Sequence, residues 1–422
     1  MRGGKQAPVD LSDITAQLEE STGVTHDVMQ PNAQRHSSTG KSSMLYDQDR
    51  VSTHSVHRWI EWGLAITVGV IGATGTTGGM VVEGLLSSST DFSVTSLTRE
   101  VSVNNRANQH LMEKGVKIVA YDLGGPREKL VGQLKEIHVL ISCNAWEHLH
   151  LQIRWIEAAK EAGMKRFVPS ERVGPAPRGV IDIKDKFSCG ISLRGALHIT
   201  GRDDGLADQI RQNSKNEILG AIQRARLPYT IINMGCWYQV WVPRVPSERS
   251  DHAHSIYIDL QVVGDGRVRF ALAGLSDIGK YVAQIVADPR TLNRHVLAYT
   301  EVLSMNEIWD AMAKASGEQC LKDYVMEEEL HEIIASCRKS LEASSESMSH
   351  PSNIMDTASF NMGQYCISWC ARGDNTPEYA DYLGYLDYWK LFPNYTKGKR
   401  PESNLPRSSR GVLIRNSSHS FP

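Results

Sequence analysis

The sequence predicts an α/β protein built on a doubly wound parallel sheet, with a smaller C-terminal lobe. Strand and helix patterns alternate from about residue 63 to residue 235, the strands are apolar almost throughout, and a glycine-rich turn joins the first strand to the first helix. Strands that are apolar along their whole length are typical of parallel sheets with helices on both faces. Right-handed crossovers between such strands produce a doubly wound sheet.

The alternating region starts with an expected strand at 66–72, "ITVGVIG", and an amphipathic helix at 76–89. Further strands are expected at 92–99, 116–122, 138–144, 165–171 and 227–235, and further helices at 105–115, 126–135, 151–163 and 215–226. After Gly235 the alternation stops, because residues 236–246 are aromatic and rich in turn formers. Helical patterns dominate from there, at 277–289, 304–317, 327–343 and 377–392. We therefore expect a smaller lobe over 236–395 that closes over the carboxyl edge of the sheet.

The two ends of the chain are polar and have no sustained hydrophobic period. We expect residues 1–62 to form a disordered extension and residues 396–422 a disordered tail. The 422 residues carry a formal net charge of −2, so no overall basic field favours nucleic acid or a membrane surface. No segment reaches the roughly 18–20 apolar residues of a membrane span, and the N-terminal residues lack the apolar core of a secretory leader. We expect a cytoplasmic protein.

The cysteines and histidines give no sign of a metal site. The seven cysteines include no CxxC pair, and Cys366 and Cys370 are expected to be a buried, reduced pair on one helix face. Two His-x-His pairs occur at 148–150 and 252–254, but no acid or cysteine completes a ligand set with either pair at the spacing that metal ligands need. We expect no bound metal.

The turn "GVIGATGTTGG" has the context that a dinucleotide site needs, because a strand precedes it and a helix follows it. Gly72 can turn tightly out of the strand, Gly75 lets the backbone approach a diphosphate, and Gly78 lets the helix pack close to the strand. The free N–H groups and positive dipole end of the helix would then bind the phosphates. The hydroxyl groups of Thr74, Thr76 and Thr77 add donors. Residues 63–235 are therefore expected to form an NAD(P)-binding Rossmann domain.

The end of the second strand, "SLTRE", indicates which dinucleotide is bound. An arginine at this position can bind the 2′-phosphate of NADP, whereas an acid would bind the ribose hydroxyl of NAD. Arg99 favours NADP, but a shift of one residue would put Glu100 in that place instead. Asp122, which ends the third strand, can contact the edge of the adenine or cap the next helix.

Four segments in this order, "GVIGATGTTGG", "SLTR", "KRFVPSE" and "LPYTIIN", resemble the NmrA-like and isoflavone-reductase-like branch of the atypical short-chain dehydrogenases. The resemblance covers about residues 66–395, and the segments 175–180 and 234–247 resemble a fungal subgroup of that branch. It implies an NADPH-dependent reductase of secondary metabolism that acts on an aromatic or polyketide-like small molecule.

The resemblance also implies a catalytic lysine, in a K-x-x-I pattern at the start of the helix before the "PYT" strand. This pattern falls on Lys215, with Ile218 at its fourth position. A lysine that is partly desolvated beside a cationic nicotinamide loses its proton more readily, so it can act as a general acid or base. On the residues alone, Lys215 is equally a surface lysine in the first turn of a helix.

The distance between Glu171 and Lys215 departs from the family pattern, which has about two dozen residues here. We interpret residues 186–213 as a surface insertion or as a translated intron, because the flanking segments read as one continuous stretch. The departure puts the position of the lysine in question, and Lys184 or Lys186 could take its place.

The resemblance places further residues at the carboxyl edge of the sheet. Ser142 and Cys143 end the fourth strand, where the family holds the nicotinamide ribose, and Glu171 ends the fifth. Cys236, Trp237 and Tyr238 follow the sixth strand and are expected to line the substrate pocket, with core packing as the alternative.

Three functions compete. The first is the reductase, with Lys215 as general acid or base. The second is an NmrA-type regulator that senses NADP without turnover; such proteins tend to lack the lysine. The third is an inactive descendant in which the insertion disrupts the site. The presence of Lys215 favours the enzyme.

Overall fold

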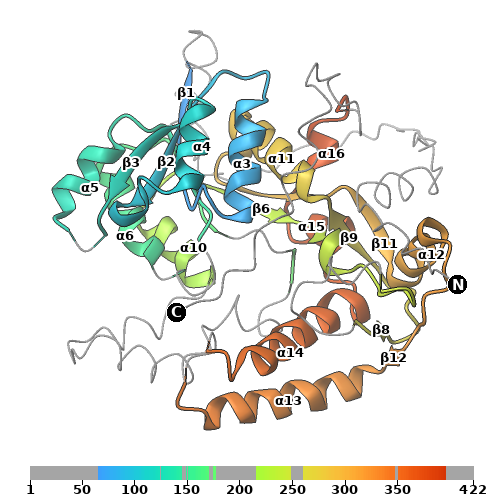
Figure 1. Ribbon diagram of the computed structural model, residues 1–422. Helices are drawn as coiled ribbons and strands as arrows, with labels where there is room; N and C mark the ends of the chain where they lie inside the picture. The colour runs from blue at the N-terminus through green and yellow to red at the C-terminus, as the bar shows by residue number, and fades with distance from the viewer. Residues whose placement is uncertain are drawn as a thin grey trace, which may run out of the picture.

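The computed structural model describes residues 65–123, 125–144, 149, 151–170, 174–176, 215–248, 260–346 and 350–395 (Figure 1). The predicted N-terminal extension, the insertion at 186–213 and the C-terminal tail lie outside these ranges.

A parallel sheet forms the centre of the larger layer, with the strand order β3-β2-β1-β4-β5 (Figure 1). Its strands are β1 (Ile66–Ile71), β2 (Phe92–Arg99), β3 (Lys117–Tyr121), β4 (Val139–Ser142) and β5 (Arg166–Val168). Every neighbouring pair is parallel. A parallel bridge between Phe167 and Tyr229 carries the layer on to β6 (Thr230–Met234), which pairs with β10 (Arg294–Ala298). The predicted α/β fold with a parallel central sheet is confirmed.

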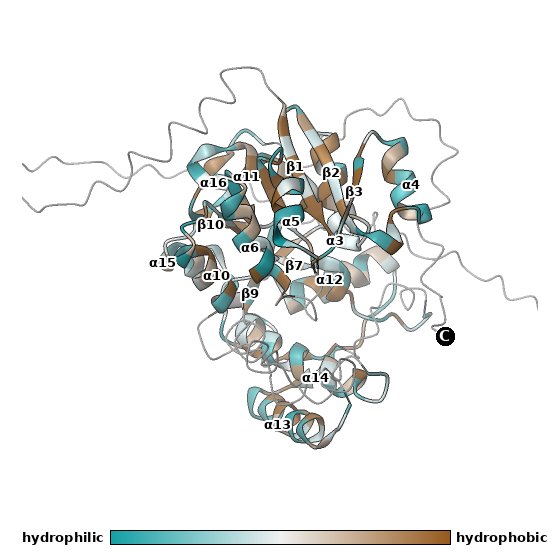
Figure 2. Ribbon diagram, turned by 90° about the vertical axis from the view of Figure 1, so that its left-hand side faces the viewer, coloured by the Kyte–Doolittle hydropathy of each residue, from teal (hydrophilic) through white to brown (hydrophobic). Residues whose placement is uncertain are grey.

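Helices cover both faces of this sheet. They are α3 (Thr76–Leu86), α4 (Arg106–Glu113), α5 (Arg127–Leu134), α6 (Gln152–Glu161), α10 (Lys215–Arg224) and α11 (Leu275–Ala287). Val70 belongs to the apolar core under α3, α4 and α11, whereas its neighbour Ile71 belongs to the core under α5, α6 and α10. Successive strand side chains point to opposite faces, so central strands such as β1 and β4 are buried along nearly their whole length. Figure 2 shows this as brown strands between helices with teal outer sides.

Helices α3 and α11 touch backbone to backbone. A Cβ atom on Gly279 would lie 1.9 Å from the carbonyl oxygen of Met80, and one on Gly84 would lie 2.0 Å from the carbonyl carbon of Gly279. No side chain fits at this crossing, so the two glycines fix how closely α11 lies to α3.

The second lobe has its own sheet and core. Strand β9 (Arg269–Ala273) pairs in parallel with β7 (Cys236–Trp237) and antiparallel with β11 (Glu301–Ser304). A short parallel pair is formed by β8 (Val262–Val263) and β12 (Tyr324–Val325). The helices are α12 (Met305–Ser316), α13 (Glu327–Ala343) and α14 (Ile354–Tyr365), followed by the π-helix η6 (Cys366–Ala371). In Figures 1 and 2, α13 and α14 form a hairpin at the far end from β1 and β2.

The chain crosses between the two layers more than once. After β7 and β9 it returns to the α/β layer through α11 and β10, and later through β13 (Leu386–Asp387) and α16 (Tyr388–Leu391). The predicted boundary at 235/236 and the predicted lobe over 236–395 stay predictions; within 236–395, α11 contacts α3 and β10 pairs with β6. Strand β13 has two residues, which is too short to leave a periodic signal in the sequence.

The last described segment also differs from the prediction. Residues 377–392 were expected to be helical, but α15 (Pro377–Tyr382) ends early and Gly384 has a φ of 75°. This left-handed residue turns the chain into β13. Cys366 and Cys370 lie buried in η6, and both are free thiols.

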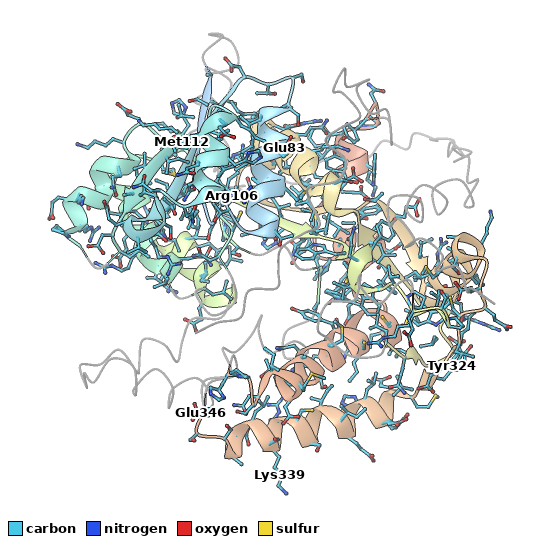
Figure 3. All side chains as sticks on the ribbon, in the orientation of Figure 1. Glu83, Arg106, Met112, Tyr324, Lys339 and Glu346 are labelled. Atoms are coloured by element: carbon cyan, nitrogen blue, oxygen red, sulfur yellow. The ribbon has the colours of Figure 1, made fainter. Side chains whose placement is uncertain are left out.

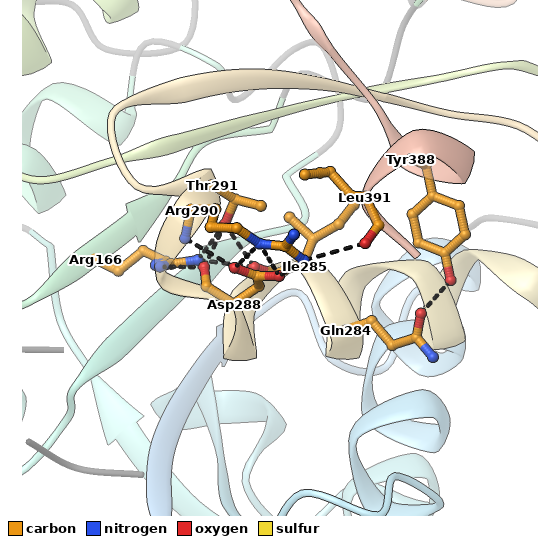
Figure 4. Close-up of polar contacts among 8 residues, drawn as sticks. All are labelled: Arg166, Gln284, Ile285, Asp288, Arg290, Thr291, Tyr388 and Leu391. Atoms are coloured by element: carbon orange, nitrogen blue, oxygen red, sulfur yellow. Dashed lines mark hydrogen bonds and ion pairs between the residues drawn. The ribbon is translucent and has the colours of Figure 1, made fainter. Parts of the chain in front are cut away.

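A buried arginine holds the amino end of β5 (Figure 4). Arg166 is 2% exposed and donates through Nη1 to the carbonyl oxygen of Ile285 at 2.9 Å and to Oγ1 of Thr291 at 2.8 Å. Its Nη2 donates to the carbonyl oxygen of Asp288 at 3.0 Å. Burial lowers the pKa of Arg166 to about 10, which still leaves it charged at neutral pH. The guanidinium thereby binds the last carbonyls of α11, where the helix dipole is negative.

Candidate active site

The glycine turn after β1 is shaped by backbone contacts on its inner side. Gly72 has a φ of 75°, and a Cβ atom there would lie 2.8 Å from the carbonyl oxygen of Cys143. A Cβ atom on Gly78 would lie 2.0 Å from the carbonyl oxygen of Gly72. The Gly75 N–H donates to this same oxygen at 3.0 Å, which closes the turn. Gly72 and Gly78 are therefore required by the turn itself.

The outer side of the turn is open. Thr74, Gly75 and Thr76 are exposed, and α3 starts at Thr76. Gly75 is the N-cap and offers no side-chain cap, and the first turn of α3 has no acidic residue. The free N–H groups and the positive end of the helix dipole therefore face outward without a side-chain acceptor, which suits a phosphate group. Within the described residues, this cradle fits the diphosphate of a dinucleotide.

The end of β2 lies beside the turn, because β1 and β2 are paired neighbours. Arg99 is the last residue of β2 and is exposed, whereas Glu100 begins a short 3₁₀ helix. Arg99 therefore lies at the carboxyl end of β2, and Glu100 lies one residue beyond it. Arg106, the first residue of α4, is also exposed (Figure 3).

Asn108 holds the chain on both sides of Arg99, at the end of β2. It is 0% exposed and donates through Nδ2 to the carbonyl oxygen of Ser102 at 2.7 Å. It also contacts Ser96 and Thr98 at 3.4 Å. The sequence analysis missed this residue, although a polar side chain three positions before the apolar Leu111 lies on the inward face of α4.

Asp122 is exposed just beyond β3, and its carbonyl oxygen accepts the Gly125 N–H at 3.2 Å. The N-cap of α5 is Pro126, so Asp122 does not cap that helix. Asp122 lies at the carboxyl end of β3, and its contact with the adenine stays a prediction.

The ends of β4 and β5 complete this edge. Ser142 is fully buried opposite Ile71, and the Cys143 N–H donates to the Ile71 carbonyl oxygen at 2.9 Å. Ser170 donates through Oγ to the carbonyl oxygen of Asn144 at 2.7 Å. Glu171 lies outside the described residues.

Lys215 is the first residue of α10, and its side chain lies outside the described residues, as do Lys184 and Lys186. Ile218 and Ile222 pack α10 onto the sheet, and the helix leads into β6. A helix that leads into a parallel strand runs antiparallel to it, so α10 begins at the carboxyl edge. The backbone of Lys215 is therefore at the same edge as the glycine turn.

The residues after β6 have internal partners. Trp241 donates through Nε1 to Sγ of Cys236, and burial raises the pKa of the Cys236 thiol. Tyr238 donates through its hydroxyl to Oε2 of Glu301 at 3.2 Å, and both residues are buried. Trp237 is half-buried and packs against the core of the α/β layer. Cys236 and Tyr238 thus have packing roles in the second lobe.

A sequence model of the NmrA-like family matches residues 65–180 and 210–385. The chain belongs to the NmrA-like family. The match leaves out 181–209, which overlaps the predicted insertion at 186–213. The predicted family resemblance is confirmed.

Relatives of this NmrA-like protein carry the names of oxidoreductases. It is 37% identical over 334 residues to an asnovolin J 5′,6′-dehydrogenase of Aspergillus novofumigatus, covering 78% of this chain and 92% of that protein. It is 29% identical over 270 residues to a phenylcoumaran benzylic ether reductase of Nicotiana tabacum, covering 62% and 78%. The fold matches a leucoanthocyanidin reductase–NADPH complex from Vitis vinifera with a TM-score of 0.57 and 20% identity, covering 78% and 95%. These names agree with the predicted class of enzyme and with NADP(H) as cofactor.

Among the described residues, no three His, Cys, Asp or Glu side chains come together as a metal-ligand set, and both His-x-His pairs lie outside those residues. No described helix is both long enough and apolar enough to cross a bilayer.

Proposed function

We propose that the protein is an NADPH-dependent oxidoreductase that transfers hydride to or from an aromatic or polyketide-like small molecule. The observation that carries this proposal is the uncapped N-terminus of α3 behind the glycine turn, with Arg99 at the end of the neighbouring strand. Phosphate groups bind at such helix ends, and a planar guanidinium is suited to the additional phosphate of NADP.

The dinucleotide would lie along the carboxyl edge of the sheet. The backbone from Gly72 to Gly78 and the hydroxyl groups of Thr74, Thr76 and Thr77 would hold the diphosphate. Arg99 would bind the 2′-phosphate, and Asp122 would contact the adenine. Cys143, which adjoins the glycine turn through Ile71, would contact the nicotinamide ribose, and the fully buried Ser142 would lie beneath it.

The chemistry needs a hydride and a proton. NADP(H), when bound, supplies or accepts the hydride. In the reducing direction, the ammonium group of Lys215 donates a proton to the substrate oxygen that receives the electron pair of the broken bond, and water returns a proton to the amine. In the oxidising direction, the neutral amine takes the proton from the substrate. Proton transfer by a positioned group contributes about 100- to 10,000-fold to a rate.

The substrate would lie between the carboxyl edge and the second lobe, with Glu171, Cys236, Trp237 and Tyr238 at its boundary. Cys236 and Tyr238 use their polar atoms internally. They would therefore shape the pocket wall rather than donate hydrogen bonds to the substrate. Trp237 is half-buried on β7 and would offer an aromatic surface for stacking.

The test combines binding with turnover. Purified wild type, Lys215→Met and the surface control Lys129→Met are titrated with NADPH and NADH by nicotinamide fluorescence. Each is then given NADPH with isoflavonoid, lignan-like, quinone and polyketide-like compounds, and NADP⁺ with their reduced forms. We expect all three to bind NADPH, with turnover about 100- to 10,000-fold lower in Lys215→Met alone.

Two results would contradict the proposal. Absence of NADPH binding by the wild type would show that the glycine turn holds no dinucleotide. Binding without turnover across the whole panel, in both directions, would favour an NmrA-type sensor that does not consume its ligand.

A further inference from the structure

One buried amide joins the loops that follow β4 and β5. Gln152, the first residue of α6, is 0% exposed. Its Oε1 accepts the Ser170 N–H at 2.8 Å, and its Nε2 donates to the carbonyl oxygen of Leu149 at 3.4 Å. Leu149 lies between β4 and α6 and Ser170 follows β5, so this side chain joins the start of α6 to the residue that follows the end of β5.

The same loops are joined a second time, and this contact leads on to the glycine turn. The Ser170 hydroxyl donates to the carbonyl oxygen of Asn144 at 2.7 Å. The preceding residue, Cys143, donates its N–H to the carbonyl oxygen of Ile71. The carbonyl oxygen of Cys143 packs so closely on Gly72 that a Cβ atom there would lie 2.8 Å from it. A continuous set of contacts therefore connects Gln152 to the ends of β5, β4 and β1.

Packing alone does not account for an amide at this position. The inward side of α6 is otherwise apolar, with Trp155, Ile156 and Ala159 almost completely buried. A buried amide carries a desolvation cost that its hydrogen bonds must offset, and a methionine would fill a similar volume without that cost. The amide therefore serves its two partners, and both belong to loops at the carboxyl edge.

We propose that Gln152 is a positioning residue, which holds the loops after β4 and β5 so that the nicotinamide ring and the substrate meet in the reactive arrangement. This inference rests on the proposed function. Gln152 would act on the reacting atoms through Ser170, Asn144 and Cys143. A displacement of about 1 Å at a reacting centre can lower a rate about 100-fold.

The test variant is Gln152→Met, which keeps the length and burial of the side chain and removes both hydrogen bonds. We expect kcat to fall about 10- to 100-fold and KM for the second substrate to rise. The dissociation constant of NADPH should change less than about threefold, because the glycine turn and Arg99 hold the other end of the molecule. Gln152→Glu keeps the acceptor for Ser170 and should give an intermediate kcat.

The matched control is Thr291→Val, at the opposite end of β5. Thr291 is also 0% exposed and also bonds to β5, through Arg166. Both variants are assayed well below their melting temperatures, measured by circular dichroism. The emission maximum and intensity of bound NADPH are recorded as a readout that needs no turnover. We expect Gln152→Met, but not Thr291→Val, to change this emission.

The outcomes separate the two proposals. If the wild type does not bind NADPH, the proposed function fails and the role of Gln152 fails with it. If the wild type binds NADPH but Gln152→Met has the same emission, and the same kcat and KM wherever turnover is measurable, only the positioning role is overturned. A fall in kcat for Thr291→Val equal to that for Gln152→Met would also overturn the positioning role, because both losses would then come from a general loosening of β5.

Discussion

The two ends of β5 are both held by buried polar side chains, but the chemistry of the two ends differs. At the amino end, charged Arg166 binds the last carbonyl groups of α11 (Figure 4). At the carboxyl end, neutral Gln152 binds two loops beside the glycine turn. A helix C-terminus offers carbonyl oxygens that suit a buried cation. The amide at the other end carries no charge, so the positive electrostatic field at that edge comes from Arg99 and the N-terminus of α3.

This difference indicates a division of labour along one strand. The amino edge joins β5, α11 and β10 and contributes stability. The carboxyl edge collects the ends of β1, β2, β4 and β5 and would bind the dinucleotide. Variants at the amino edge should therefore alter unfolding, and variants at the carboxyl edge should alter binding and turnover.

The largest effect is expected at the amino edge. Arg166→Met removes three hydrogen bonds from a charged donor, so the free energy of unfolding should fall by about 3 kcal/mol. The neighbouring exposed variant Lys165→Met should stay within about 0.5 kcal/mol of wild type. Urea unfolding measures both. If Arg166→Met still folds but weakens NADPH binding more than about threefold, the amino edge does not serve stability alone.

The next effect is expected at the carboxyl edge. Arg99→Gln should raise the dissociation constant of NADPH about 10- to 100-fold, because a charged hydrogen bond contributes about 1.5–3 kcal/mol. Binding of NADH and the free energy of unfolding should be unchanged. Calorimetric titration measures both ligands. The control is Lys117→Gln, which also removes one positive charge but lies at the amino end of the neighbouring strand β3. Equal losses for NADPH and NADH would contradict the assignment of Arg99 to the 2′-phosphate.

A smaller effect is expected for Thr291→Val. The Thr291 hydroxyl lies 2.7 Å from the carbonyl oxygens of Ile285 and Asp288 and accepts from Arg166. Its loss should lower the free energy of unfolding by about 1–1.5 kcal/mol and leave NADPH affinity unchanged. Combined with Arg166→Met, the two losses should sum to less than their separate values, because the two residues share partners. Full additivity would show that they act independently.

The smallest effect concerns two thiols. Cys143 is half-buried beside the glycine turn, whereas the pKa of the Cys236 thiol is raised by burial. Alkylation at pH 8 should modify Cys143 and spare Cys236, since the thiolate is the reactive form. NADPH at about one to four times its dissociation constant should slow the reaction of Cys143 about two- to fivefold, because only the sites without ligand then react. Peptide mass spectrometry measures the alkylation of each cysteine. A rate at Cys143 that is the same with and without NADPH would contradict a position beside the cofactor.

Local patterns allowed the strands β1–β6 and their helices to be predicted from the sequence. Strand β1 is apolar on both sides, as Val70 and Ile71 illustrate by belonging to opposite cores. The glycine turn was predictable because a strand precedes it and a helix follows. The strand register, which places Arg99 opposite Tyr121, could not be read from the sequence, and the choice between Arg99 and Glu100 stays a prediction.

Long-range contacts were not predictable in the same way. Strand β10 pairs with β6, more than 60 residues earlier in the chain, and β13 pairs with β10 in turn. Gln152 reads as a polar residue at the start of an amphipathic helix, and its partner Ser170 lies 18 residues further along. The available signal was that Trp155 and Ile156, three and four positions on, are apolar, which puts Gln152 on the inward face.

Hydrogen–deuterium exchange with and without NADPH tests the central claim most directly, because it reports binding along the whole chain without a substrate. We predict that NADPH slows exchange at the turn 72–80, at the end of β2 and at 142–144, and leaves the amino edge around 285–291 unchanged. Protection confined to the second lobe, or none at saturating NADPH, would contradict the assignment of the carboxyl edge as the dinucleotide site.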